Sequence, residues 1–176
     1  PPSAHARVSG LIERLELHGV AMEAITAPKT VSVEMLRLGK PEIATQAAEG
    51  HVAITVKDVT PERRDWTFSP GSVRVSTDQP LGDLVVLLLE PQSSESFFAW
   101  GMIPEVLTRV EYIEAYAIAP LADAMLAADP GLRAEFEAKL AADPKFAASP
   151  GARLAWFYKR TPFYDDRYLL YPIARD

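Results

Sequence analysis

Cysteine is absent from the sequence, which excludes disulfide bonds, thiolate catalysis and cysteine-ligated metal sites. The 3 histidines, His5, His18 and His51, lie far apart, and none belongs to a His-x-x-Glu or His-Glu-x-x-His pattern. A catalytic zinc ion would need three distant ligands to converge, whereas separate surface histidines need no special arrangement. We therefore predict no metal ligand in this chain.

Motifs that build phosphate and nucleophile sites are also missing. The sequence has only 9 glycines and contains neither Gly-x-Gly-x-x-Gly nor a P-loop, so nothing indicates a dinucleotide or phosphate cradle. The Gly-x-Ser-x-Gly turn of the α/β-hydrolases does not occur. Acidic residues that could form a hydrolytic pair, such as Glu90, Asp165 and Asp166, occur in any acidic protein. We predict no catalytic residue here.

Long apolar runs and excess positive charge are lacking as well. The longest aliphatic run, residues 84–89, is far shorter than the ~20 residues that cross a bilayer, so we expect no membrane span. The net charge of -6 disfavours phosphate backbones, and we expect no nucleic-acid partner. A chain without cysteine suits an oxidising or a reducing compartment, so periplasmic, secreted and cytoplasmic locations all stay open.

The residues that are present are typical of one compact domain. A length of 176 residues, with 48% apolar and 24% charged residues, fits a single globular domain over 1–176. The sequence begins with Pro1 and Pro2 rather than with Met. We therefore expect the chain to be a piece of a longer protein or the product of a cleaved precursor.

Residues 8–76 predict a helix followed by strands. Apolar side chains recur at helical spacing from residue 8 to residue 15, and Gly19 can close that helix. Period-two alternation then indicates strands, and their short connections favour antiparallel pairing. We predict one mostly antiparallel sheet over about residues 20–76. The alternation slips at Leu36, so the second strand either ends near Met35 or carries a bulge there.

From residue 77 onwards the pattern is helical. Thr77 or Asp78 can cap a helix that Pro80 opens, and the aliphatic residues that follow predict a helix buried nearly all round. Further helix starts are marked by the pairs Asp129-Pro130, Asp143-Pro144 and Ser149-Pro150. The predicted fold class is therefore α+β, with the antiparallel sheet flanked by an N-terminal helix and a C-terminal group of helices.

Two groups of residues are candidate binding positions. At the mouth of the aliphatic helix, Thr77, Asp78 and Gln79 combine polar side chains with unsatisfied backbone N–H groups, an arrangement that binds anions but that helix capping also explains. Trp100 is a further aromatic candidate, and the second group is the aromatic and basic tail, namely Tyr158, Lys159, Arg160, Tyr164, Arg167, Tyr168 and Tyr171. Core packing, contact with another domain, and a platform for a peptide or glycan ligand are the three interpretations of this group.

Three segments resemble a known family. They are PGSVRVSTDQPLGDLVVLLLEP at residues 70–91, SFFAWG at 96–101 and YLLYP at 168–172. Together they resemble the C-terminal region of bacterial zinc-carboxypeptidase-like proteins of the carboxypeptidase A type. In that family an upstream catalytic domain carries a His-x-x-Glu pair, a distant His, a Glu general base and an Arg that holds the substrate carboxylate. None of these motifs maps onto this chain, so the resemblance places any zinc ion upstream.

Three functional hypotheses follow. The preferred one is a noncatalytic accessory domain that packs on the upstream catalytic domain of the same protein or shapes its substrate entrance. The second is a module that binds a peptide or glycan through its aromatic surface. The third is an independent hydrolase, which requires two carboxylates that face each other in a cleft.

Overall fold

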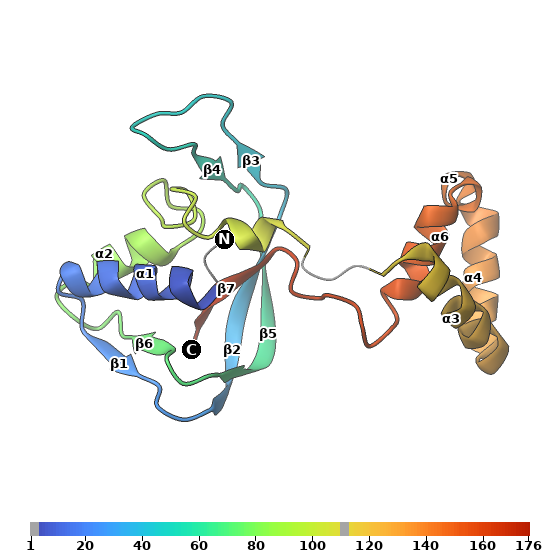
Figure 1. The fold of residues 1–176 in the computed structure, drawn as a ribbon, viewed down its shortest axis with the longest axis horizontal. Coiled ribbons are helices and arrows are strands. Elements are labelled where there is room, and N and C mark those ends of the chain that lie inside the picture. The colour runs from blue at the N-terminus through green and yellow to red at the C-terminus, as the bar shows by residue number, and fades with distance from the viewer. Residues whose placement is uncertain (1–3, 110–112) are drawn as a thin grey trace. The chain divides into compact units, whose positions relative to one another are not determined.

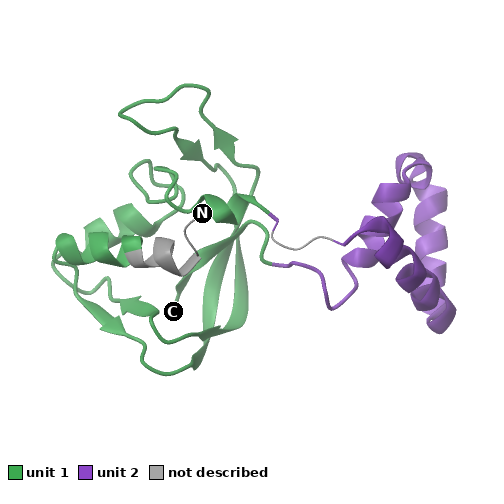
Figure 2. Ribbon diagram, in the orientation of Figure 1, with its two compact units in different colours: residues 1–108, 167–176 green, residues 109–166 purple. Residues whose placement is uncertain are grey.

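The computed structural model describes residues 4–109 and 113–176, and the chain divides into two compact units. Unit 1 contains residues 1–108 and 167–176, and unit 2 contains residues 109–166 (Figure 2). Unit 2 is therefore an insertion between two segments of unit 1. The expectation of a single domain over 1–176 stays a prediction.

Unit 1 combines helices with antiparallel strands (Figure 1), so the predicted α+β class is confirmed. Its elements in chain order are α1 (Ala4–Leu17), β1 (Met22–Ala24), β2 (Lys29–Leu38), β3 (Glu42–Ile43), β4 (Ile54–Thr55), β5 (Val59–Phe68), β6 (Val73–Val75), α2 (Gly82–Leu89), the 3-10 helix η1 (Pro104–Leu107) and β7 (Leu170–Arg175). The N-terminal helix ends as predicted, because Gly19 adopts a φ of 80° two residues after α1.

The strands do not form the single sheet predicted for residues 20–76. Within the described residues they form three antiparallel sheets, in which β1 pairs with β6, β3 pairs with β4, and β2 lies between β5 and β7. The sequence pattern did not reveal β7, which comes from the C-terminal segment. Alternation indicates which face of a strand is buried, but it does not indicate which strand lies beside it.

The slip in the alternation of β2 has a structural cause. Val33 and Met35 belong to one buried cluster, whereas Leu36 and Leu38 belong to another, so the strand buries opposite faces along its length. Pairing with β5 is continuous, but the register with β7 shifts between Met35 and Arg37. The bulge alternative is confirmed, and the alternative of a strand that ends near Met35 is wrong.

The start of α2 corrects a second prediction. The helix begins at Gly82 rather than at Pro80, its N-cap is Leu81, and no side chain caps it. A Cβ atom at position 82 would lie 2.0 Å from the carbonyl oxygen of Thr77. Glycine is therefore needed because the polar segment before the helix passes too close for a side chain. Thr77 and Asp78 precede α2 without capping it.

The main core of unit 1 joins both helices to β7. Phe98 is 0% exposed and packs edge to face with Tyr171, with the ring centroids 6.0 Å apart. The hydroxyl of Tyr171 donates to the carbonyl oxygen of Leu89 at 2.8 Å, which holds the end of α2 against β7. Burial raises the pKa of Tyr171, so this hydroxyl stays protonated.

Unit 2 consists of α3 (Ala115–Ala128), α4 (Pro130–Ala142), α5 (Pro144–Ala148) and α6 (Pro150–Tyr158). The three predicted helix starts are confirmed, because Asp129, Asp143 and Ser149 each accept a hydrogen bond from a backbone N–H of the helix that follows. The core is aromatic, and its ring centroids lie 4.7 Å apart for Phe136 and Phe157. No helix in the described residues is long and apolar enough to cross a bilayer.

Candidate functional site

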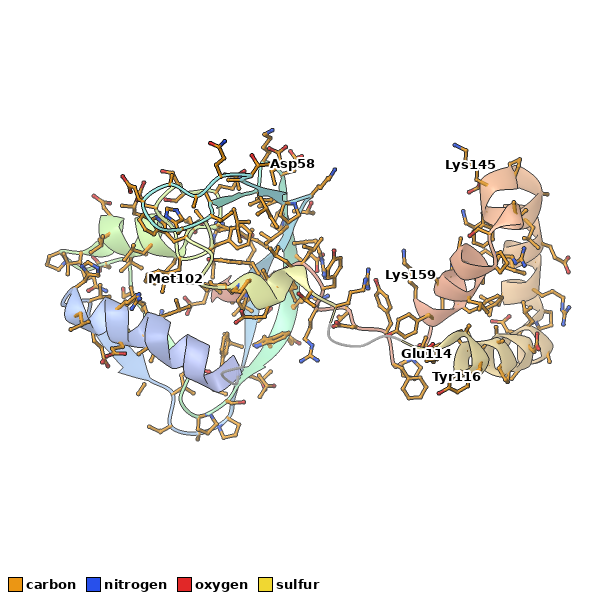
Figure 3. The ribbon with its side chains drawn as sticks, turned by 45° about the horizontal axis from the view of Figure 1, so that its top comes forward. Asp58, Met102, Glu114, Tyr116, Lys145 and Lys159 are labelled. Carbon is orange, nitrogen blue, oxygen red and sulfur yellow. The ribbon has the colours of Figure 1, made fainter. Side chains whose placement is uncertain are left out.

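An open groove of about 360 Å³ lies where α1 and α2 meet the loop that follows α2. Trp100, one of the predicted binding residues, forms part of its wall. The other lining residues are Arg14, Leu87, Leu88, Glu95, Phe97 and Met102, the last of which Figure 3 labels. The groove thus brings a predicted aromatic residue together with aliphatic side chains and two opposite charges.

The loop between α2 and η1 holds Trp100 in place. Ser96 is 0% exposed, and its hydroxyl donates to the carbonyl oxygen of Ser93 at 2.9 Å and accepts from the N–H of Ala99 at 3.1 Å. The backbone N–H of Trp100 donates to the carbonyl oxygen of Ser96 at 3.0 Å. These bonds satisfy a buried hydroxyl and fix the loop, so Ser96 has a structural role.

The side chain of Trp100 contacts residues from two sides. The ring of His51 stacks on the indole with a centroid distance of 3.8 Å and an interplanar angle of 13°. His51 is placed by the β3–β4 hairpin, whose tight turn at Glu49 and Gly50 has φ values of 52° and 81°. The indole N–H donates to Glu95 at 3.4 Å. These contacts limit the rotation of the indole.

Exposed aliphatic residues also occur on the two helices that line the groove. Val86 and Leu87 of α2 are 45% and 43% exposed, and Leu17 of α1 is 80% exposed. The prediction that α2 is buried nearly all round is therefore wrong, because the core of unit 1 covers only the side that carries Val85. We call the groove with Leu17 and Val86 the α1–α2 surface. Large aliphatic side chains that gather at a surface mark contact sites.

The charged groups at this groove define what it can hold. Arg14 offers hydrogen-bond donors and Glu95 offers acceptors, while Leu87, Trp100 and Met102 supply apolar walls. An apolar side chain or a sugar ring can pack on such walls, with its polar groups bonded at the edge. Such an arrangement is typical of binding surfaces.

The predicted anion-binding position is held by internal hydrogen bonds. The side-chain oxygen of Gln79 accepts from the N–H of Ala21 at 2.8 Å, and its nitrogen donates to the carbonyl oxygens of Ala21 and Ser76 at 3.1 and 2.6 Å. Gln79 thereby ties the start of β1 to the segment before α2. Thr77 and Asp78 are exposed beside it. A ligand role for these three residues stays a prediction.

The predicted tyrosines are divided between the units. Tyr158 and Tyr164 meet in unit 2 with ring centroids 5.3 Å apart, and the Tyr158 hydroxyl donates to the carbonyl oxygen of Phe163 at 3.1 Å. Tyr168 belongs to unit 1, where its carbonyl oxygen accepts from Arg37 at 2.6 Å. The structure thus brings Tyr158 and Tyr164 together, and the binding role of all three tyrosines stays a prediction.

The candidate carboxylates and histidines occupy separate places. Glu90 in unit 1 bonds the guanidinium of Arg175, whereas Asp165 and Asp166 belong to unit 2. His51 stacks on the indole of Trp100, and the side chain of His5 lies outside the described residues. Across the described ranges, no three His, Asp or Glu side chains are close enough to hold a metal ion. These residues therefore do not fit a zinc site.

Sequence reasoning missed several residues that the structure makes prominent. Arg14 lies on the polar side of an amphipathic helix, and Leu87 lies in an aliphatic run, so neither position suggested a shared groove. Tyr116 of α3 is 81% exposed (Figure 3) but stands in an apolar stretch of sequence. One signal was available for α2: an eight-residue helix that is aliphatic on every side needs a partner on every side.

Half of the chain is similar to a small part of fungal proteins named Carboxypeptidase 2. The relative from Trichophyton rubrum is 32% identical over 94 residues, which cover 53% of this chain and 17% of the relative. The relatives from Trichophyton tonsurans and Trichophyton equinum are 31% identical with the same coverage. No family model and no solved structure matches the chain. The chain thus contains a carboxypeptidase-related region, and these relatives give no support to a bacterial origin.

Proposed function

We propose that this chain is a noncatalytic accessory region of a zinc carboxypeptidase-like metallopeptidase. It packs on a catalytic domain of the same polypeptide or shapes the substrate entrance of that domain. The observation that carries the proposal is the similarity to 17% of the length of Carboxypeptidase 2 proteins, which leaves most of each relative outside the match. In this proposal the zinc ion belongs to the catalytic domain, and the substrate is a peptide bound there.

The α1–α2 surface is the face that we assign to this contact. It combines the groove, which Leu87 and Trp100 line, with the exposed Leu17 and Val86 of the same two helices, and it carries one positive and one negative charge at Arg14 and Glu95. Domain interfaces typically combine an aliphatic or aromatic centre with a polar edge. Burial of these side chains against the catalytic domain removes apolar surface from water and stabilises the association.

A binding experiment with two matched variants tests the proposal. The chain is titrated with the separately produced catalytic domain, and association is measured by calorimetry together with release of C-terminal residues from peptides. Leu87→Lys places a charge in the contact and lowers affinity about tenfold, while lysine remains favourable in the last turn of a helix. Ile43→Lys, at a 61% exposed position on β3, leaves affinity unchanged. Absence of association, or equal loss in both variants, contradicts the proposal.

A second candidate function is peptide or glycan binding by the groove itself. It is favoured by the fixed indole of Trp100 beside the carboxylate of Glu95, because sugar rings and apolar peptide side chains stack on such walls while their polar groups bond to nearby acceptors. The paired rings of Tyr158 and Tyr164 provide a further aromatic surface on unit 2.

Titration with defined ligands separates the two functions. Cell-wall peptides and N-acetylated oligosaccharides are added to the chain, and binding is followed by calorimetry and by tryptophan fluorescence. Saturable binding that Trp100→Ala abolishes and Tyr158→Ala preserves supports the groove. The opposite pattern assigns the ligand to the tyrosine pair, and absence of saturable binding with both ligand classes removes this second function.

A further inference from the structure

A cavity of about 300 Å³ in unit 1 lies between α1, the β1–β6 pair and the central sheet. It shares no lining residue with the Trp100 groove, because α1 contributes Leu11, Ile12 and Leu15 to the cavity and Arg14 to the groove. The remaining walls are mainly aliphatic and include Val33 of β2 and Val73 of β6. Apolar cavities of this size are typical of small-ligand sites.

Four charged residues, Glu23, Lys29, Arg74 and Asp176, line the cavity together with these walls. Two of them, Arg74 and Asp176, form an ion pair. Arg74 bonds Asp176 at 2.9 Å, which lowers the pKa of the Asp176 carboxyl and raises that of Arg74, and Glu23 lies opposite Arg74 in the β1–β6 register. The charge of Lys29 also helps to lower the pKa of Asp176, but its ammonium group has no hydrogen-bond acceptor within the described part of the chain.

We propose that this cavity binds an amphiphilic anion, with an apolar chain or ring system inside the aliphatic walls and the anionic group at the ammonium of Lys29. The walls favour hydrocarbon because its burial removes apolar surface from water. Lys29 favours an anion because its ammonium group donates no hydrogen bond to the described part of the chain, whereas Arg74 is already bonded to Asp176. The site is independent of the α1–α2 surface and does not rest on the proposed function.

A homologous series of ligands tests the proposal with the full chain. Hexanoate, octanoate, decanoate and dodecanoate, all below their micelle concentrations, compete with 8-anilinonaphthalene-1-sulfonate, and displacement is followed by fluorescence. Affinity rises about fourfold with each added methylene until the chain fills the cavity, and then stops rising. Alkyltrimethylammonium ions of equal length bind more weakly, by up to about fivefold, because they cannot pair with Lys29. Equal binding of cations and anions, or absence of saturable binding, overturns the proposal.

Three variants locate the binding. Val73→Trp fills the cavity from β6 and abolishes saturable binding, whereas Leu87→Trp, in the α1–α2 surface, preserves it. Lys29→Gln, at an exposed side chain, removes the preference for carboxylates over cations but retains the dependence on chain length. Circular dichroism checks that each variant is folded. If Val73→Trp does not fold, Lys29→Gln still tests the proposal. Loss of binding in Leu87→Trp alone assigns the ligand to the Trp100 groove and contradicts the proposal.

Discussion

Unit 1 and unit 2 are stabilised by contacts of very different sequence range. In unit 1, Arg37 of β2 donates to the carbonyl oxygen of Tyr168, which is 131 positions later, and Tyr171 reaches back 82 positions to Leu89. In unit 2, the helix starts are fixed by bonds that span only two or three positions, as from Asp129 to Leu132. Local contacts form at a smaller cost in chain entropy. Unit 2 therefore owes more of its structure to neighbouring residues than unit 1 does.

The two segments of unit 1 that flank the inserted residues are bonded to each other. The N–H of Leu169 donates to the carbonyl oxygen of Val106 at 3.1 Å, and Leu169 in turn accepts from the N–H of Leu38 at 2.8 Å. The segments that flank residues 109–166 are thus held together by unit 1 itself. Host domains tolerate an insertion at such a place because the two chain ends that it joins already lie close together.

Removal of unit 2 has the largest expected effect and tests whether the chain is one domain. Residues 109–166 are replaced by a short Gly-Ser linker, and thermal unfolding is followed by circular dichroism. We expect unit 1 to retain its cooperative transition, because the buried clusters around Phe98 and Met35 lie outside the deleted segment. In contrast, deletion of residues 170–176 removes β7 and unfolds unit 1. Loss of the transition in the linker variant would show that the chain behaves as a single domain.

Truncation of one core ring in each unit comes next in size. Phe98→Ala in unit 1 and Phe157→Ala in unit 2 each lower the free energy of unfolding of their own unit by about 3 to 5 kcal/mol, because both rings are buried. Calorimetry is expected to show one transition shifted and the other retained in each variant. A shift of both transitions by the same amount would mean that the two units unfold together.

Substitution of one glycine in α1 and one in α2 by alanine is expected to change the stability of unit 1 in opposite directions. Gly82→Ala costs unit 1 about 1 to 3 kcal/mol, because the new Cβ meets the Thr77 carbonyl oxygen and the backbone must shift. Gly10→Ala has open space around its Cβ and stabilises α1 by about 0.5 to 1 kcal/mol, because alanine is the better helix former. Chemical denaturation measures both. Equal effects would contradict the close approach at Gly82.

The capping residues of unit 2 carry a smaller local contribution. Asp129→Ala removes the acceptor for the N–H groups of Gly131 and Leu132, and it lowers the stability of unit 2 by about 1 kcal/mol. Asp123→Ala, in the interior of α3, serves as the control and has an effect within about 0.5 kcal/mol. Denaturation of unit 2, followed by helical circular dichroism, distinguishes the two variants.

Acidification has the smallest expected effect, and it acts on unit 1. Hydrogen bonds from Arg37 at 2.7 and 2.9 Å hold the pKa of Glu62 below its usual range. The lowered pKa means that this ion pair stabilises the fold above the ordinary carboxyl pKa and is lost as the pH falls through the lowered one. We expect a contribution below about 1 kcal/mol. Glu62→Gln reduces the loss of unit 1 stability below about pH 4, and an unchanged pH profile would contradict this assignment.

Sequence patterns were most successful where the determining contacts are local. The starts of α4, α5 and α6 were predicted because an acceptor side chain and a proline in the first turn act within a few residues. The bulge in β2 was one of two predicted alternatives, because a slip in alternation has a local cause. The C-terminal strand and the division into three sheets were missed, since they depend on which distant segments pair.

The candidate site shows the same limit. The sequence indicated Trp100 as a binding residue, but its neighbours His51 and Glu95 were recognised only from the structure. Gln79 was predicted as an anion-binding residue, and the fold uses its amide to bond the backbone of Ala21. A side chain of given chemistry can bind a ligand or the chain itself, and the choice depends on which backbone groups lie nearby.

By itself, the sequence determined the α+β class, the helix starts of unit 2 and the glycine that ends α1, because capping geometry and hydrophobic period act over a few residues. Tertiary structure alone decided that β7 joins β2, that α2 leaves Leu87 exposed, and that an aliphatic cavity opens beside Lys29. Those features arise when segments that are distant in the sequence exclude water together, and a local sequence pattern does not indicate which distant segments pack against each other.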